Sequence, residues 1–370
     1  MAGRPGILAR TISTPIILAA ILGLVALAAL AVHSGPFNQT VIDIFIRVIL
    51  VVGLYVFIGN SGVLSFGHIG FTCLGAYMTA WLTIPPPMKK MALPDLPMLI
   101  LNAKLPFYIG IIAAAAFAAF AAFLFGKILM RLSGIAASIA TFAMLAVINQ
   151  VYSNWENVTG ATSSVVGIPI NRSIWPYFLC AILVVFVAYF YAISRSGLAL
   201  RAARDEAIAA RASGVDIPRE RLIAFVLSGA IMGLGGALYA HSVGVVTPDT
   251  FYLSLTFISL SMLVVGGMNS LSGAVLGVVV LSTIIQILRW FEKGIDIGGA
   301  VLTIPNGVQE IAIGIVMIVI LMFRPTGLTR NRELVWHGWP FKKLSVGADS
   351  VAHSASADRT NAKTSNRRTS

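Results

Sequence analysis

The stretch RSGLALRAARDEAIAARASGVDIPRER (residues 195–221) is a polar segment inside a chain of long apolar runs. Ten of its 27 residues are charged, whereas charged residues make up 11% of the 370-residue chain. Apolar runs adjoin it on both sides, at 174–194 and 222–243. A helix rises about 1.5 Å per residue, so each run is long enough to cross a hydrocarbon core of about 30 Å. The segment is therefore predicted to be a loop that joins two membrane-spanning helices.

The same alternation of apolar runs and short polar breaks extends over most of the chain. Its composition is 58% hydrophobic with a mean hydropathy of +0.89, far from the values of soluble domains. We expect an all-α polytopic membrane protein with about ten transmembrane helices. The predicted spans are 12–32, 41–59, 63–83, 106–131, 134–152, 174–194, 222–243, 254–268, 271–290 and 305–323.

Two of these runs leave alternatives open. The eighth, 254–268, is short, and with the ninth it flanks GGMNSLSG (266–273), so the pair is predicted to be a hairpin that crosses the bilayer fully or in part. The first, 12–32, is either a signal peptide or a retained helix. We interpret it as a retained helix, because 21 residues exceed the usual apolar core of a signal peptide and no clear cleavage site follows.

The distribution of lysine and arginine orients the helices. With the N-terminus inside, 19 of the 26 basic residues lie on the cytoplasmic side, six lie outside and Arg47 lies within a span. Cytoplasmic loops carry such an excess, so both termini and segment 195–221, between the sixth and seventh helices, are predicted to be cytoplasmic. From about residue 345 the composition is typical of disorder. The chain then divides into a cytoplasmic N-terminus (1–11), a transmembrane domain (12–330) and a cytoplasmic tail (331–370).

Several function classes lack support in the sequence. The net charge of +12 does not indicate a nucleic-acid partner, because the basic residues lie at the ends of apolar runs and in the tail. No GxxxxGK[ST], HExxH or GxSxG motif is present, and Cys73 and Cys180 form no CxxC pair, so neither a nucleotide site nor an enzyme is indicated. Uphill transport by this chain would draw its energy from another subunit.

Small residues recur at a spacing of four within the spans. Lipid provides no hydrophobic drive for helix pairing, and small residues allow backbones to approach closely. Glycine is also simply common in membrane helices, but its spacing here favours tight packing. The pairs are Gly229 and Gly233, Gly236 and Ala240, and Gly273 and Gly277.

Polar residues within the spans are few. Asp43 and Arg47 lie four residues apart on the second helix and can pair with each other. Others are candidates either to line a pathway or to bridge two helices: Asn60, Ser65, His68, Asn149, Gln150 and Gln286. The turn-rich external loops 83–98 and 153–173 either face a partner or substrate arriving from outside or serve as connectors.

Five motifs together resemble one known family. GNSGVLSFGHIGFTCLGAYMTAWL (59–82) is similar to a characteristic segment of ABC importer permeases of the branched-chain amino acid type, the LivH/LivM family. The resemblance covers about residues 12–330, and the long N-terminal part is closer to LivM. The other four motifs follow in the order of the family: NWENVTGATSSVVGIP (154–169), ARDEAIAARASGVDIPRERLIAFVLSGAIMGLGGALYA (203–240), MLVVGGMNSLSGAVLGVVVL (262–281) and LMFRPTGL (321–328).

Three of the five motifs depart from the family pattern. Asn60 stands where an aromatic residue is usual, TGATSS lacks a glycine of the external loop, and Met268 and Asn269 replace small residues. The resemblance implies import of branched-chain amino acids or related small polar compounds such as amides and urea. Because the external loops are where a delivered substrate is met, these departures leave its identity open.

The resemblance also implies an assembly. The chain would form half of a translocation pathway in a bacterial inner membrane, and would not itself be a catalyst. Its partners would be a second, LivH-like permease, two ATPase subunits that carry ATP and Mg, and an extracytoplasmic binding protein; this chain itself would hold no cofactor. The alternative is an autonomous secondary transporter or channel. The spans lack the runs of ionisable residues that ion-driven carriers usually have, but backbone carbonyls can also bind sodium.

The resemblance to ABC importer permeases implies a role for the polar segment 195–221. In ABC importers a cytoplasmic loop of the permease forms a short helix that docks on the ATPase, and residues 199–213 are rich in helix-favouring Ala and Arg. Gly214 is expected to end this helix, and Pro218 to prevent its continuation. A solvated connecting helix is the alternative. The residues predicted to couple to the ATPase are Arg204, Asp205, Glu206, Ala207, Arg211 and Gly214.

Overall fold

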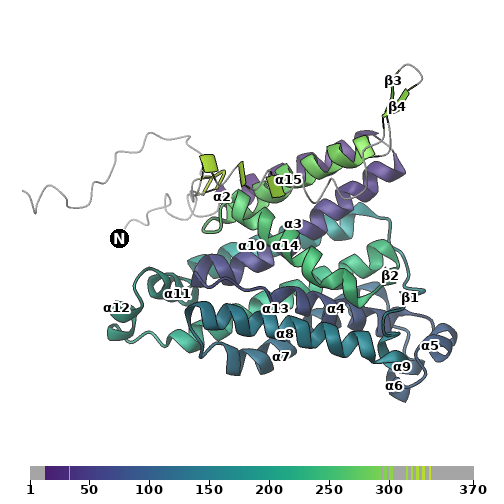
Figure 1. Ribbon diagram of the computed structural model, residues 1–370, viewed down its shortest axis with the longest axis horizontal. Coiled ribbons are helices and arrows are strands. Elements are labelled where there is room, and N and C mark those ends of the chain that lie inside the picture. Colours follow the sequence, from purple (N-terminus) through teal and green to yellow (C-terminus); the bar gives the residue numbers. More distant parts are fainter. Residues whose placement is uncertain are drawn as a thin grey trace, which may run out of the picture. The chain divides into compact units, whose positions relative to one another are not determined.

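Long apolar helices account for most of the structure. The computed structural model of the protein describes residues 13–32, 34–292, 295–297, 300–302, 314–315, 318–319, 322–324, 327–329 and 333–334. Within this part of the chain, eight helical segments are long and apolar enough to cross a membrane (Figure 1). The expected all-α polytopic fold is thus confirmed. The segments are Ser13–Val32 (α2), Gly35–Ser61 (α3), Phe107–Leu129 (α7), Gly134–Asn154 (α8), Ile174–Ile193 (α10), Ile217–Val243 (α13), Pro248–Gly266 (η1 and α14) and Leu271–Arg289 within α15.

The predicted tenth span and both chain ends lie largely or wholly outside the described residues. These are 305–323, the N-terminus 1–11 and most of the tail 331–370. The number of ten spans therefore stays a prediction. All described residues belong to one compact unit, Met1–Leu334.

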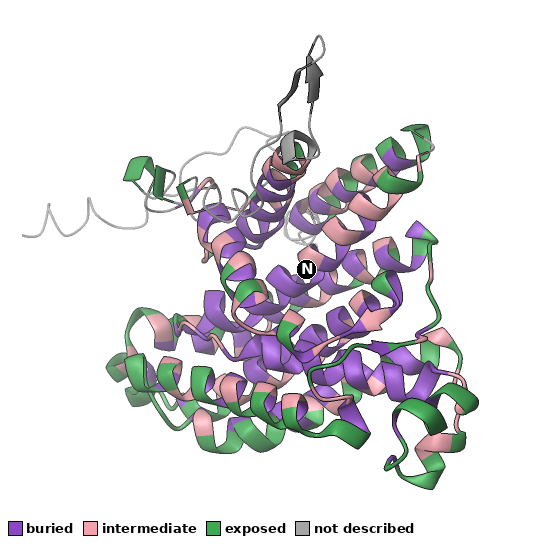
Figure 2. Ribbon diagram, turned by 45° about the vertical axis from the view of Figure 1, so that its right-hand side comes forward, coloured by how far each residue is buried: buried purple, intermediate pink, exposed green. Residues whose placement is uncertain are grey.

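α13 is the central helix, and it packs against α3, α7 and α4 (His68–Thr83). A Cβ atom added to Gly236 would lie 2.0 Å from the Thr72 carbonyl oxygen on α4. Cβ atoms added to Gly229 and Gly233 would lie 2.5 Å and 2.3 Å from alanine Cβ atoms on α7. The helix backbones approach so closely here that only glycine fits without a shift, and buried residues gather in the middle of the bundle (Figure 2).

The outer helices present apolar surface. Large apolar side chains are exposed along α2, α7, α8 and α10, for example Leu24, Ile112, Ile135 and Leu179. Exposed apolar surface of this extent would be unfavourable in water but suits contact with lipid tails. The exposed faces therefore agree with a bundle embedded in a bilayer.

The hairpin expected around GGMNSLSG is formed by α14 (Leu253–Gly266) and α15 (Leu271–Glu292). At 14 residues α14 is about 21 Å long. The short 3₁₀-helix η1 (Pro248–Phe251) precedes it. A Cβ atom on Gly277 would lie 2.1 Å from the Met262 carbonyl oxygen, and one on Gly273 would lie 2.7 Å from the Gly266 carbonyl oxygen. Glycines on α15 thus allow the two arms of the hairpin to touch.

The third predicted span begins later than expected. Sequence predicts a helix from residue 63, whereas α4 starts at His68 and residues 62–67 form a loop. Gly62 ends α3 in the left-handed conformation (φ +69°), and Ser138 Oγ on α8 donates a 2.6 Å hydrogen bond to the Leu64 carbonyl oxygen. Irregular backbone is tolerated at membrane depth where protein covers it, and Val63, Ser65 and Gly67 of this loop are buried. Apolar composition alone does not reveal such a break.

The two turn-rich loops pack together at one end of the bundle. The first contains α5 (Pro86–Ala92) and α6 (Met98–Asn102); the second contains α9 (Glu156–Thr159) and β1 (Val165–Val166), which pairs antiparallel with β2 (Val245–Val246). Asn157 Nδ2 donates to Asp95 Oδ2 at 2.8 Å and joins the loops. A separate hairpin of β3 (Ile295–Ile297) and β4 (Ala300–Leu302) follows α15.

Lys89 anchors the first of these loops. Its side chain is buried, and Nζ donates hydrogen bonds to the carbonyl oxygens of Trp81 (2.7 Å), Ile100 (2.7 Å) and Ala103 (2.5 Å). Burial lowers the pKa of the Lys89 ammonium, because loss of solvent disfavours the charged form. The three carbonyls replace the lost water and fix α5 and α6 to the end of α4.

Candidate functional site

The polar segment 195–221 folds into two short helices at the end of the bundle opposite to α5, α6 and α9 (Figure 1). They are α11 (Arg195–Asp205) and α12 (Ala207–Ala212). Glu206 between them is extended, with φ −150° and ψ 99°, and its carboxylate accepts a 3.3 Å hydrogen bond from the Ile208 amide. The single helix expected over 199–213 is therefore wrong. Ala and Arg favour helix on both sides, but Glu206 caps a new one.

Two further residues define the end of the segment. Gly214 has φ +85° and follows α12, a conformation that suits glycine. Asp216 then caps α13 by accepting a hydrogen bond from the Arg219 amide at 3.3 Å, and Pro218 lies in the first turn of α13. Pro218 thus starts the next helix, where its missing N–H costs nothing.

The two short helices have a buried side and an exposed side. Ala203, Ala210 and Ile217 form a small apolar cluster of their own, which holds α11, α12 and the start of α13 together. On the exposed side lies Ile208, 79% exposed, with Glu206 and Arg211 also exposed. Sequence reasoning missed Ile208, although it is the only large apolar residue of α12.

Arg204 connects α11 to the transmembrane helices. Its Nη1 atom donates to the Gly59 carbonyl oxygen at 2.6 Å and to Asn269 Oδ1 at 3.3 Å, and its Nη2 atom lies 3.0 Å from Asp205 Oδ1. Its Cγ would lie 2.5 Å from a Cβ atom on Gly62, so the side chain lies directly against the end of α3. One guanidinium therefore contacts both the end of α3 and the turn between α14 and α15.

A segment near the end of the described chain reinforces the same turn. The Leu328 amide donates to the Val265 carbonyl oxygen at 2.9 Å, and Thr329 Oγ1 lies 2.8 Å from Ser270 Oγ. The Glu333 carboxylate accepts hydrogen bonds at 2.7 Å and 3.0 Å from the first two amides of α15, where negative charge is favoured. Sequence reasoning missed Glu333, because its partners lie 61 and 62 residues away.

Four separated motifs therefore meet at one end of the bundle. Hydrogen bonds from backbone and side-chain groups of these motifs connect α11 to α3 and to the turn before α15. The segments that meet are 59–62, 204–205, 265–272 and 327–329 with Glu333.

The six polar residues proposed as pathway or bridging residues lie in three places. Asn60, Ser65 and His68 are buried near the end of α3, and His68 Nδ1 lies 2.7 Å from Ser65 Oγ. The rings of Phe57 and Phe225 enclose His68 at centroid distances of 5.0 Å and 4.9 Å. The His68 ring on α4 thus packs between α3 and α13, whereas Asn60 Nδ2 donates to the Val56 carbonyl oxygen within α3.

The remaining three residues lie elsewhere. Asn149 and Gln150 are on α8, half-buried and exposed respectively. Gln286 on α15 borders a small hollow together with Asp43 and Arg47. No single path joins all six residues.

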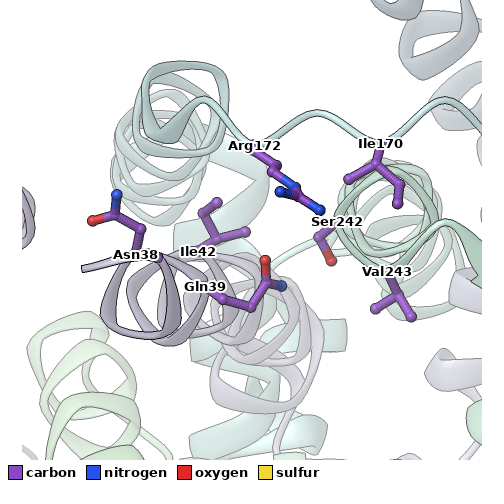
Figure 3. A pocket seen from close by; sticks show the side chains of 8 residues that line it. Asn38, Gln39, Ile42, Ile170, Arg172, Ser242 and Val243 are labelled. Carbon is purple, nitrogen blue, oxygen red and sulfur yellow. The ribbon is translucent and has the colours of Figure 1, made fainter. Parts of the chain in front are cut away.

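A larger hollow lies between α3 and α13, at the end of the bundle away from Arg204. Its volume is about 420 Å³. The side chains of Gln39 and Arg172 extend toward the space between these helices (Figure 3). It is lined by Gly35, Asn38, Gln39, Ile42, Ile170, Arg172, Ser242 and Val243.

Comparison with known proteins adds the family context. The family described as "Branched-chain amino acid transport system / permease component" matches residues 36–321. The high-affinity branched-chain amino acid transport system permease protein LivM of Escherichia coli K12 is 27% identical over 349 residues, which cover 82% of this chain and 74% of that protein. LivM of Salmonella typhimurium is also 27% identical, with the same coverage.

A shorter match points to a related importer. The autoinducer 2 import system permease protein LsrC of Escherichia coli O9:H4 is 31% identical over 147 residues, 39% of this chain and 41% of that protein. No solved structure matches the chain.

Proposed function

The chain belongs to the branched-chain amino acid permease family of ABC transporters, and we propose that α11 and α12 couple it to a separate ATPase subunit. It is an ABC importer permease and a multi-pass protein of the inner membrane. In the proposal it forms half of a translocation pathway for branched-chain amino acids or related small polar compounds. A second, LivH-like permease, two ATPase subunits with ATP and Mg, and an extracytoplasmic binding protein complete the transporter. Both termini and the segment 195–221 face the cytoplasm.

The observation that carries this proposal is that Arg204 belongs to α11 and contacts two membrane elements. On one side, α11 packs against α3, α10 and α13, whereas α12 packs mainly against α11 and the start of α13. On the other side, Arg204 contacts Gly59 and Asn269, which belong to α3 and to the turn of the α14–α15 hairpin. A displacement of α11 by a docked ATPase would therefore act on two membrane elements at once.

Docking itself is assigned to the exposed side of α12. Ile208 projects from a helix otherwise made of alanines and Arg211, so it is the one large apolar side chain on that helix. An exposed apolar side chain with charged neighbours is typical of an anchor that fills a pocket on a partner. Glu206 and Arg211 would then contribute charge at the edge of that contact, whereas Arg204 acts inward.

The packed external loops support a docking surface for the binding protein. Trp81 Nε1 donates to the Val158 carbonyl oxygen at 3.0 Å, and His241 Nδ1 lies 2.8 Å from the Pro169 carbonyl oxygen. These bonds fix the second loop to α4 and α13, and Lys89 fixes the first loop to α4. A fixed surface loses little conformational freedom when a partner binds, which favours recognition.

The docking proposal is tested by replacing its anchor. Ile208→Asp should weaken co-purification of the ATPase by at least about tenfold, because a carboxylate would be buried without a partner. Leu198→Asp is the matched control: Leu198 is also exposed, at 54%, but lies on α11. Both variants are compared at equal membrane abundance. Equal retention of the ATPase by the two variants would contradict the proposal.

A further inference from the structure

A row of polar side chains runs along α3 from the outer hollow to the middle of the helix. Gln39, Asp43 and Arg47 follow one another at intervals of four residues and so share one face of the helix. Facing them, α15 contributes Gln286 and Arg289 to the same small hollow. One acidic and two basic side chains thus meet between α3 and α15.

These charges lie well inside the membrane-spanning length. At about 1.5 Å per residue, Arg47 is about 18 Å along α3 from Gly35 and about 18 Å from Gly59 at the other end. Ionisable side chains at such depth are costly and mark ligand or ion pathways. Asp43 and Arg47 are therefore candidates for function rather than for stability.

The direct pair expected between Asp43 and Arg47 is not formed. No contact within 4.0 Å joins the Asp43 carboxylate to the Arg47 guanidinium in the described part of the chain. Asp43 Oδ1 instead accepts a 3.3 Å hydrogen bond from Gln39 Nε2. The Asp43 carboxylate and the Arg47 guanidinium thus line the same hollow without forming a direct ion pair.

Polar atoms around these hollows are buried without a protein partner. They are Asn38 Oδ1, Arg47 Nη1 and Ser282 Oγ. Asn38 lines the outer hollow, and Arg47 and Ser282 line the small hollow between α3 and α15. Buried polar atoms in folded proteins almost always have a hydrogen-bond partner, so such a cluster points to a polar ligand.

The space has the size of a small organic molecule. A hollow of about 190 Å³ is lined by Asp43, Arg47 and Arg289 together with apolar side chains. It equals about six water molecules at their share of liquid volume. Through Gln39 and Val243 it adjoins the outer hollow of about 420 Å³. A solute entering between α3 and α13 would reach the charged residues by this route.

We propose that Asp43, Arg47 and Arg289 form a site within the translocation path that holds the head group of a small α-amino acid zwitterion. Arg47 and Arg289 would bind the carboxylate, for which guanidinium geometry is well suited. Asp43 would accept hydrogen bonds from the ammonium. An apolar substrate side chain would contact Ile46, Leu50 and Leu255, which line the same hollow. This inference rests on the proposed import function and assigns residues to its substrate.

The test measures binding of three probes to the chain in lipid nanodiscs by saturation-transfer NMR. L-leucine carries both charges, isoamylamine lacks the carboxylate, and 4-methylpentanoate lacks the ammonium. Leucine should bind at least about tenfold more tightly than either analogue, because each lost charge removes a charge-assisted hydrogen bond. Equal affinity for the three probes, or no binding of leucine, would overturn the proposal.

Variants test each charge separately. Arg47→Gln should reduce leucine affinity to that of isoamylamine and leave isoamylamine binding unchanged. Asp43→Asn should reduce leucine affinity to that of 4-methylpentanoate. If Arg47→Gln does not insert, Arg47→Lys should still prefer leucine over isoamylamine, but bind it more weakly. Unchanged leucine affinity in Arg47→Gln and Asp43→Asn would mean that these charges have only a structural role or contact a partner subunit, and would overturn the site.

Two controls keep this test independent of ATPase coupling. Arg172→Gln removes an exposed charge from the outer hollow and should leave leucine affinity within about twofold. Ile208→Asp, at the other end of the bundle, should leave leucine binding unchanged. Loss of ATPase docking with intact leucine binding, or the reverse, would show which of the two proposals fails.

Discussion

At the scale of single residues, the half-buried Arg204 and the buried Lys89 have different partners and different consequences. Arg204 contacts a carbonyl, an amide oxygen and a carboxylate that belong to three separate segments, so it links parts of the fold that move in the proposed mechanism. Lys89 contacts three backbone carbonyls of a single loop and its neighbouring helix. The first is therefore expected to affect coupling, and the second stability.

Replacement of Lys89 tests the stabilising role. Lys89→Met leaves three buried carbonyls without their donor, and we expect a loss of about 3 kcal/mol in the free energy of unfolding. The measurement is thermal unfolding in detergent, followed by intrinsic fluorescence. Lys90→Met is the matched control, since Lys90 is exposed on the same helix. Equal melting temperatures of the two variants would show that the buried bonds contribute nothing.

Single residues also show what can and cannot be predicted from the sequence. Asp43 and Arg47 stand out in the sequence because charges are rare in apolar runs. Their proximity to Arg289 was not predicted. Arg47 and Arg289 are 242 residues apart, and the sequence does not show that α3 and α15 lie side by side. The i, i+4 spacing favoured a local pair of Asp43 with Arg47, whereas the fold brings Arg289 into the same hollow as both residues.

At the scale of elements, helix bounds follow closely from the apolar runs. The run 134–152 became α8, Gly134–Asn154, because membrane thickness sets the length of an uninterrupted apolar helix. The start of α4 and the break at Glu206 were not predicted. Both depend on single backbone conformations, at Gly62 and at Glu206, which composition over a window does not register.

The glycines of α13 give a prediction at this scale. Gly236→Ala introduces a Cβ atom 2.0 Å from the Thr72 carbonyl oxygen, so the helices must separate, at a cost of about 1–3 kcal/mol. Gly23→Ala on α2 is the control, because no atom lies within 4 Å of its added Cβ, and better helix propensity should make it neutral or stabilising. Thermal unfolding of the two purified variants gives the comparison. A Gly236→Ala protein as stable as Gly23→Ala would contradict the close contact.

At the scale of the whole molecule, the two ends of the bundle serve different purposes. One end gathers the motifs around Arg204 and exposes Ile208, and the other carries the packed external loops and the outer hollow. Apolar run counts and basic-residue asymmetry predicted the helical class and an orientation. The meeting of the four motifs was not predicted, because Gly59 and Arg204 are 145 residues apart and only the three-dimensional fold joins them.

Orientation in the membrane is testable with reporter fusions. Fusion after Asn157 should report the outside and fusion after Gly214 the cytoplasm, because basic residues accumulate on the side of α11 and α12. The two sites lie in loops at opposite ends of the bundle (Figure 1). Reports of the same side from both fusions would refute the topology.

The central claim is that Arg204 transmits ATPase movement to the membrane helices. The most direct measurement is the amount of substrate imported per ATP hydrolysed by the complete transporter in proteoliposomes. Arg204→Gln should retain the ATPase subunits and hydrolyse ATP, but import at least about tenfold less substrate per ATP, since its charged hydrogen bonds to Gly59 and Asn269 are lost. Arg195→Gln, at an exposed arginine of the same helix, should import normally. An Arg204→Gln transporter with the import per ATP of the unmodified protein would contradict the account.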